Sequence, residues 1–342
     1  MSRSSSGSLP QYILQRVLLV IPMIWVILTL VFVVLRVAPG DPVSAALGGK
    51  LDPEALDQRR EALGLNEPLI SQYWDYLSSV ARFDFGTTFS DNQPVLRVIR
   101  DNGGATLSLT LAAFLIALLV GIPLGMLAGR YRDSVADVVI RMFGIVSYAA
   151  PIFFVGFLLQ VYVAKPLGLP TSGASSPITA FTVEPVTHIL LIDVFLSGDG
   201  AAIEDVLKHL LLPAVTLGLL ICGVFIRLVR VNLLQTISSD YVEAAEARGL
   251  DRGKVTRRHA FRNALVPVVT VIGLQFALLL GGAVLTESTF NWPGLGQKLV
   301  EYINDRDYGA VQGIITVFAV AVVLISLLVD VINALIDPRV RY

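Results

Sequence analysis

The stretch NGGATLSLTLAAFLIALLVGIPLGMLAG, residues 102–129, runs for 28 residues without an aspartate, glutamate, lysine or arginine. A helix needs roughly 20 mainly apolar residues to cross the hydrocarbon core of a membrane. Five more charge-free stretches of comparable length occur along the chain, at 17–35, 142–164, 209–226, 263–286 and 308–329. We therefore predict an all-α polytopic membrane protein with six transmembrane helices.

The expected spans are 13–36, 105–129, 142–164, 209–229, 264–286 and 308–332. One side of the membrane is then expected to hold the tail 1–12, the loops 130–141 and 230–263, and the tail 333–342. The other side holds the segments 37–104, 165–208 and 287–307. The first of these is long enough to form a small external domain between helices 1 and 2.

Composition agrees with a membrane protein and excludes several other classes. Of the 342 residues, 54% are hydrophobic and 15% are charged, and the mean hydropathy is +0.71. A soluble chain has about 25% charged residues. One cysteine, Cys222, cannot form an intrachain disulfide, and 26 basic against 27 acidic residues give no global basic field for nucleic acid.

The distribution of charge between the loops predicts the orientation. The segments on the side of the N-terminus hold 15 basic and 8 acidic residues, whereas the other side holds 11 and 19. Because basic residues are enriched in cytoplasmic loops, both termini are expected to be cytoplasmic. The charge-free stretch of the first span, 17–35, is 19 residues long and is followed by Arg36 without a small-residue cleavage pattern. Signal-peptide cores are about 7–15 residues long, so we interpret this span as a retained helix.

The external segments contain signals for shorter helices. Asp52-Pro53 starts a charged stretch that closes at Gly64, as expected for a helix. A second stretch places an apolar and aromatic stripe on one helical face, made of Ile70, Tyr73, Trp74, Leu77 and Val80 or Ala81. This stripe is either a docking surface or substrate contact, or a helix that rests on the membrane interface or packs its own small core. We favour the second interpretation because aromatic residues are common at membrane–water boundaries.

Two later external stretches are also expected to be short. The apolar run 189–196 is interrupted by Asp193, so it is not expected to span the membrane. The stretch NWPGLGQKLVEYINDRD, residues 291–307, predicts a turn at Pro293-Gly294 and a short helix after it.

The most informative loop is DYVEAAEARGLDRGKVTRRHAFRNALVP, residues 240–267. Asp240 and Glu243 have the spacing of a capping box, and Gly249 suits the left-handed end of a helix. The helix between them presents a face of small residues, Ala244, Ala245 and Gly249, which lets another backbone approach closely. The positive-inside bias explains the arginines of this loop but explains neither the small face nor the caps.

This loop resembles the EAA loop of permease subunits of ATP-binding-cassette (ABC) importers, in which Glu-Ala-Ala is followed by three residues and a glycine. Three other motifs resemble the dipeptide, oligopeptide and nickel permeases more narrowly, and the outer segment before the second span, together with Pro39-Gly40-Asp41-Pro42, resembles the first permease of a pair. The matching positions are HAFRNALVP (His259, Arg262, Asn263, Pro267), ESTFNWPGLG (Glu287, Pro293, Gly294, Gly296) and RDY (Arg306, Asp307, Tyr308). The loop 165–208 is longer and less regular than this family suggests.

The resemblance implies a type I ABC importer permease fold, with the importer transmembrane domain at about 105–334, in a bacterial cytoplasmic membrane. It implies that the loop helix docks on a separate ATPase through Asp240, Glu243, Ala244, Ala245, Arg248 and Gly249. The implied partners are a second homologous permease, two ABC ATPase domains or subunits, an extracytoplasmic substrate-binding protein and membrane lipid, with no nucleic acid.

The chain itself is expected to be non-catalytic, with no cofactor and no metal site, because ATP and magnesium would bind to the ATPase subunits. The sequence agrees, since it has no G-x-x-x-x-G-K-[ST] phosphate-binding motif. The nearest match, Gly253-Lys254, has Arg248 at the first glycine position and Val255 in place of the hydroxyl residue.

Three other classes of protein fit the sequence less well. An ion-coupled secondary transporter usually carries ionisable residues inside its spans, and the six stretches have no acidic or basic residue other than His209 at an edge. Against a membrane enzyme, His188, His209 and His259 do not have the spacing of metal ligands. A receptor or scaffold would leave the EAA loop unexplained. Peptide is the expected substrate, with nickel complexes, glutathione or oligosaccharide as alternatives.

Overall fold

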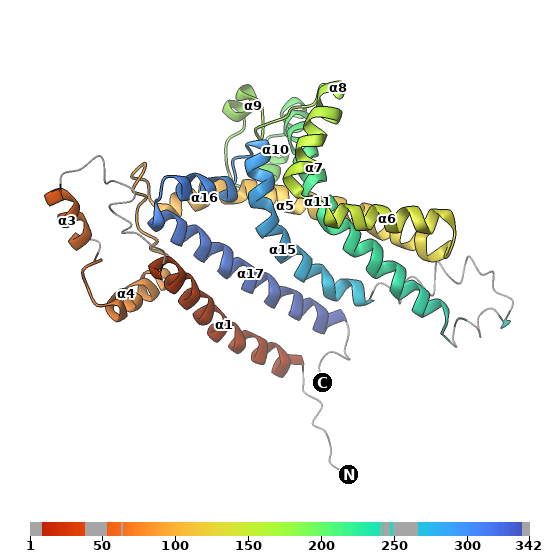
Figure 1. The fold of residues 1–342 in the computed structure, drawn as a ribbon, viewed down its shortest axis with the longest axis horizontal. Helices are drawn as coiled ribbons and strands as arrows, with labels where there is room; N and C mark the ends of the chain where they lie inside the picture. The colour runs from red at the N-terminus through yellow and green to blue at the C-terminus, as the bar shows by residue number, and fades with distance from the viewer. Residues whose placement is uncertain are drawn as a thin grey trace, which may run out of the picture.

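The computed structural model of the chain describes residues 9–37, 53–62, 64–239, 242, 247–248 and 266–336. These residues are almost entirely helical; the β pairing among them is a single bridge between Thr87 and Pro94. The elements are α1 (Leu9–Val37), α3 (Pro53–Ala62), α4 (Leu69–Ala81), α5 (Val95–Arg130), α6 (Val135–Ala149), α7 (Ile152–Leu159), the π-helix η1 (Gln160–Ala164), α8 (Lys165–Leu167), α9 (Pro177–Thr182), α10 (Leu190–Leu196), α11 (Gly200–Ile237), α15 (Val266–Phe290), α16 (Leu295–Asn304) and α17 (Tyr308–Ile336) (Figure 1).

Five of these helices, α1, α5, α11, α15 and α17, are long and apolar enough to cross a membrane, and a bent pair supplies a sixth candidate span. The bent pair replaces the straight helix that we expected at 142–164. Its two arms, Val135–Ala149 and Ile152–Leu167, meet at an angle of 108°. The residue before a proline is pushed out of the helical region, and Ala150, which precedes Pro151, lies at φ −72° and ψ 134°. The break therefore occurs at this dipeptide.

Several helices are longer than the charge-free stretches that predicted them. α5 begins at Val95 instead of 105, and α11 runs from Gly200 to Ile237 instead of 209–229. The loop expected at 130–141 shrinks to the turn between α5 and α6. The boundaries differ because charged residues such as Asp101, Lys208 and Arg230 continue the helices beyond their apolar cores.

The centre of the bundle is the α5–α11 pair, whose backbones approach closely at glycines. A Cβ on Gly125 would lie 2.8 Å from the carbonyl oxygen of Ile226, and one on Gly218 would lie 2.7 Å from that of Ala113. Small residues at such contacts are typical of helix packing in membranes, where tight van der Waals contact replaces the hydrophobic effect. Around this contact gathers the largest buried apolar cluster, which includes Leu109, Leu217, Phe225, Leu279 and Trp292.

The first helix lies at the periphery, beside α17 (Figure 1). Most large apolar side chains of α1 are exposed, such as Leu18, Leu19 and Ile21, as expected for a helix that faces lipid. Arg16 pairs with Asp330 of α17 at 3.0 Å.

The predicted short helices are present. α3 lies where the charged stretch predicted it, and Gly64 two residues after its end has φ +65°. α4 carries the aromatic stripe, and Tyr73 packs against Phe32 of α1 with ring centroids 5.3 Å apart, while Trp74 stays 60% exposed. This arrangement agrees with a helix that rests on the end of the bundle.

The loop predicted to be irregular, 165–208, contains α8, α9, α10 and the first turns of α11. α10 is short, as predicted, and its Asp193 is buried because the carboxylate accepts hydrogen bonds from the Thr187 N–H at 2.7 Å and hydroxyl at 2.6 Å. The elements α7–α10 gather on one side of the α5–α11 pair (Figure 1).

Candidate functional site

Most of the predicted ATPase-coupling segment, residues 240–249, lies outside the described residues. This holds for Asp240, Glu243, Ala244, Ala245 and Gly249, and also for the motif residues His259, Arg262 and Asn263. Arg248 lies in an exposed turn, and Pro267 lies in the first turn of α15.

One described residue of the predicted coupling segment packs against the bundle. Val242 is buried in a cluster with Leu233 near the end of α11, against Met126 of α5 and Ile237. Its backbone N–H donates to the carbonyl of Ser239 at 2.9 Å. Val242 therefore contacts both central helices, α5 and α11.

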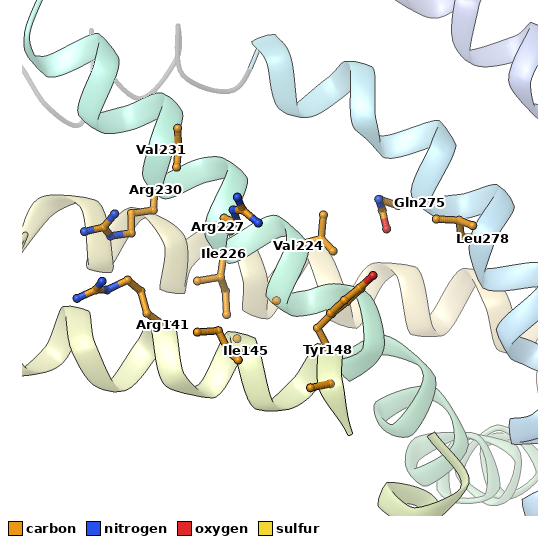
Figure 2. Close-up of a pocket in the computed structure, with 13 residues that line it drawn as sticks. Arg141, Ile145, Tyr148, Val224, Ile226, Arg227, Arg230, Val231, Gln275 and Leu278 are labelled. Atoms are coloured by element: carbon orange, nitrogen blue, oxygen red, sulfur yellow. The ribbon is translucent and has the colours of Figure 1, made fainter. Parts of the chain in front are cut away.

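A cavity of about 630 Å³ opens next to this end of the bundle, between α6, α11 and α15. Its wall is mostly apolar, and its polar side chains are those of Arg141, Tyr148, Arg227, Arg230 and Gln275 (Figure 2). A volume of this size is in the usual range, roughly 300–1,000 Å³, of pockets that bind small molecules.

One edge of the cavity is built around a buried carboxylate. Asp137 of α6 is fully buried and receives both arms of the Arg230 guanidinium, at 2.7 Å and 2.8 Å. Arg141 contacts the same carboxylate at 3.3 Å, and the Asp133 N–H donates to it at 3.0 Å. Bidentate pairing of this kind is strong and geometrically specific, so Asp137 fixes α6 against α11.

Sequence reasoning missed these cavity residues. In the sequence, Arg141, Arg230 and Asp137 contribute only to the charge of the loops that flank the spans. Gln275 is the one usable signal, because it is a polar amide in the middle of the charge-free stretch 263–286.

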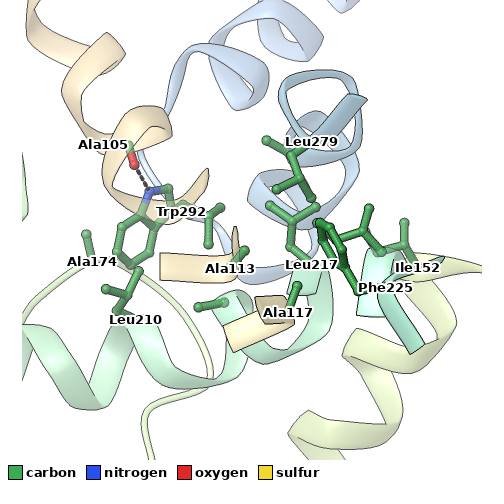
Figure 3. Close-up of a cluster of buried hydrophobic side chains, with 14 of the residues drawn as sticks. Ala105, Ala113, Ala117, Ile152, Ala174, Leu210, Leu217, Phe225, Leu279 and Trp292 are labelled. Atoms are coloured by element: carbon green, nitrogen blue, oxygen red, sulfur yellow. Dashed lines mark hydrogen bonds between the residues drawn. The ribbon is translucent and has the colours of Figure 1, made fainter. Parts of the chain in front are cut away.

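The motif ESTFNWPGLG forms a buried corner at the other end of α15, and we call residues 287–297 the α15–α16 corner. The fully buried Glu287 carboxylate accepts the Gln297 N–H at 2.9 Å, at the start of α16. The Trp292 indole N–H donates to the Ala105 carbonyl of α5 at 3.0 Å (Figure 3). The Leu295 N–H donates to the Thr106 hydroxyl at 2.8 Å. The corner therefore anchors α15 and α16 onto α5.

The glycines of this corner are required by space. A Cβ on Gly294 would overlap the Glu287 carboxylate, and one on Gly296 would lie 2.6 Å from the Cα of Val284. Pro293 precedes Gly294 in the turn, as the sequence predicted. The predicted motif residues between 287 and 296 therefore contact one another in the folded chain.

The RDY motif lies beside this corner at the start of α17. Arg306 is exposed with φ +57°, and Tyr308 is the first, half-buried residue of α17. Asp307 is fully buried; its carboxylate accepts the N–H groups of Phe89, of Ser90 at 3.0 Å and of Ala310 at 3.1 Å. It therefore caps α17 and holds the loop before α5 at the same time.

A tyrosine connects the two motifs to that loop. The Tyr302 hydroxyl of α16 lies 3.4 Å from an Asp91 carboxylate oxygen. Burial and the neighbouring Asp91 carboxylate raise the pKa of Tyr302 well above its ordinary value, so this tyrosine stays neutral. In the described part of the chain no cluster of three His, Cys, Asp or Glu residues could hold a metal ion.

Comparison with known proteins connects these features to a family. The model of the binding-protein-dependent transport system inner membrane component matches residues 121–342, and the N-terminal model of the same kind of component matches residues 9–110. The dipeptide transport system permease protein DppB of Alkalihalophilus pseudofirmus is 36% identical over 332 residues, which cover 97% of this chain and 99% of the relative. The glutathione transport system permease protein GsiC of Shigella flexneri is 34% identical, with coverage of 97% and 99%.

A solved structure shows the same fold. The MetNI methionine ABC transporter in an inward-facing conformation matches with a TM-score of 0.54 at 16% identity, covering 70% of this chain and 96% of that chain. The predicted all-α importer permease fold is thereby confirmed. With family models that together cover most of its length, the chain belongs to the binding-protein-dependent transport system inner membrane components.

Proposed function

We propose that this chain is the membrane-spanning permease subunit of an ATP-driven importer of short peptides. The observation that carries the proposal is the match over 97% of the chain to a dipeptide permease. The fold supports the proposal, because helices that could span a membrane are packed around close glycine contacts and adjoin a mostly apolar cavity.

The partners follow from this function. Uptake requires a second permease to complete the path, two ATPase domains or subunits that bind ATP and magnesium, and an extracytoplasmic protein that delivers the peptide. The chain supplies no catalysis of its own. The coupling segment faces the cytoplasm together with both termini, and the α15–α16 corner faces the outside.

Uptake in cells tests the proposal directly. A strain without its own peptide importers, given this chain with its neighbouring transport genes, should accumulate radiolabelled dialanine. Excess unlabelled dipeptide should compete, whereas excess nickel or maltotriose should not. The glutathione-permease relative makes glutathione the second candidate substrate. Competition by glutathione with no uptake of dialanine would replace peptide by glutathione as the cargo.

A glycine substitution tests the coupling segment. We expect Gly249→Val to lower peptide uptake and co-purification of the ATPase subunits, because a β-branched side chain opposes a left-handed helix end and thickens the docking face. Gly168→Val is the matched control, since Gly168 ends α8 at φ +63° and an added Cβ meets nothing within 4 Å. Uptake and co-purification at the control level in Gly249→Val would remove the coupling assignment.

A further inference from the structure

The cavity between α6, α11 and α15 combines an apolar wall with a few polar groups. Figure 2 shows Arg227, Tyr148 and Gln275 around the space between α11 and α15, with Val224 and Leu278 beside them. This combination is characteristic of ligand sites, in which apolar contacts supply affinity and a few polar groups set orientation.

Gln275 is the strongest sign that something binds there. It lies in the middle of α15 and is 7% exposed, yet its carboxamide makes no hydrogen bond within the described part of the chain. Its oxygen and nitrogen are not among the fully enclosed atoms that lack a partner, so they open onto the cavity, whose wall is mostly apolar. The amide faces the cavity, so a ligand with a donor or an acceptor can supply the missing partner.

The charge at the cavity edge is unbalanced. Asp137 is the carboxylate shared by Arg230 and Arg141. Arg227 lies one helical turn before Arg230 on α11, is exposed and makes no ion pair among the described residues. Arg141 and Arg230 are thus paired with Asp137, whereas Arg227 lines the cavity with no carboxylate partner among the described residues. A guanidinium matches the geometry of a carboxylate or phosphate and binds it with two parallel hydrogen bonds.

We propose that this cavity is a peptide-binding section of the transport path, an assignment that rests on the proposed function. Arg227 binds the C-terminal carboxylate of the peptide, and Gln275 and Tyr148 hydrogen-bond to its backbone amides. A peptide carries one free carboxylate and both donor and acceptor groups, and this set fits the three side chains. An anionic phospholipid would satisfy Arg227 but would leave its acyl chains against the Gln275 amide, which favours the peptide.

Photo-crosslinking tests the charge contact in the whole importer, with both permeases, the ATPases and the binding protein in lipid nanodiscs. A photoreactive phenylalanine replaces Leu278 on the cavity wall, and the probe is radiolabelled dialanine or its C-terminal amide. We expect capture of dialanine by this chain, and roughly tenfold less capture of the amide or after Arg227→Gln. Arg227→Lys should restore part of the capture. Arg132→Gln, which removes an exposed guanidinium outside the cavity, should change nothing.

A second substitution separates binding from folding. Gln275→Leu keeps the volume but removes the unpaired amide, so its apparent unfolding temperature should equal or exceed that of the wild type. Dialanine uptake should nevertheless fall. Gln235→Leu, at an exposed position of α11, is the control and should transport normally. A lower unfolding temperature for Gln275→Leu would show that the fold itself satisfies the amide and would overturn the proposal.

The outcomes also separate this inference from the proposed function. If the wild-type importer takes up no dialanine, both the proposed function and the cavity site are wrong. Wild-type uptake that is unchanged in Arg227→Gln and Gln275→Leu removes only the cavity site. Equal capture of dialanine and its amide, or capture of phospholipid in place of peptide, would likewise overturn the assignment.

Discussion

Replacing Asp137 by leucine should be among the most damaging single changes in the described bundle. The substitution removes the one carboxylate, among the described residues, that contacts both Arg230, at 2.7 Å and 2.8 Å, and Arg141, at 3.3 Å. The Arg230 side chain is only 16% exposed, so the change leaves a largely buried cation without its partner. The Asp133 N–H also loses its acceptor.

The magnitude follows from how little water reaches the pair. Breaking a buried ion pair by removing one partner costs roughly 3–5 kcal/mol. For a chain of this length that corresponds to a fall of roughly 4–7 °C in the unfolding midpoint. Arg230→Leu should cost less, because Asp137 keeps Arg141 and the Asp133 N–H. Replacing both residues by leucine removes the unpaired charge and should recover most of the loss, since apolar replacements of buried pairs are often close to neutral.

The assay is thermal unfolding of the purified importer complex in detergent. The fraction of this chain that stays folded at each temperature is measured by size-exclusion chromatography. The expected order of midpoints is wild type and the double variant highest, then Arg230→Leu, then Asp137→Leu. Glu204→Leu is the control, because its ion pair with Lys208 is exposed and should contribute nothing measurable. A double variant as unstable as Asp137→Leu would refute the reasoning, because the loss would then come from packing and not from an unpaired charge.

Three other changes test the topology and the outer motifs. A cysteine at Ser172 should react with an impermeant thiol reagent added outside the cell, and a cysteine at Ser238 only with reagent that reaches the inside. The chain's one native cysteine is buried and gives no background. Labelling of the cysteine at 238 from outside would show that the orientation is the reverse. Gly296→Ala should lower the unfolding midpoint, because the new Cβ would lie 2.6 Å from the α15 backbone. Gly281→Ala is the control, since a Cβ there meets nothing within 4 Å. Equal midpoints for the two variants would show that the α15–α16 corner can accommodate a Cβ at 296. Asp307→Ala should free the loop before α5, seen as faster proteolysis within residues 83–94, and unchanged proteolysis would show that its hydrogen bonds to that loop are dispensable.

The sequence predicts the spans well because the physical constraint on them is strong. A helix in lipid must satisfy its own backbone and carry apolar side chains over about 20 residues, so charge-free stretches mark its core. The same criterion misplaces the ends. Asp101 and Arg230 lie within continuous helices, because a charged side chain at a helix end can reach water or a buried partner such as Asp137.

The bend between α6 and α7 could not be predicted in this way. Pro123 and Pro213 lie inside continuous helices, whereas the helix breaks at Pro151. All three look alike in the sequence, because membrane helices tolerate proline wherever neighbours satisfy the freed carbonyl. What distinguishes Pro151 is the extended backbone of Ala150 before it.

The α15–α16 corner and the cavity differ in how far the sequence predicts them. The α15–α16 corner could be located by its motif, because its residues are close in sequence and its glycines are required by contacts with Glu287 and Val284. The cavity could not be located, because Tyr148, Arg227 and Gln275 come from three separate helices and meet only through the packing of α6 and α15 on α11. A polar amide in an apolar stretch was the one local sign of it.

The packing also indicates which contact between helices can open during transport. α5 and α11 touch through backbone at Gly125 and Gly218, and a Cβ on Gly223 of α11 would overlap the carbonyl of Gly144 on α6. The Asp137–Arg230 pair adds a charged link to this second contact. These three helices therefore resist separation. Between α11 and α15 the contact is made by side chains: Gly282 faces leucines, and Leu279 packs with Leu217 in the central cluster. The cavity lies at one edge of this contact. On the proposed function, we expect a movement that starts at Val242 to be carried by α5, α6 and α11 together, and the change in access to fall at the cavity edge of the α11–α15 contact, which Arg227 and Gln275 line (Figure 2).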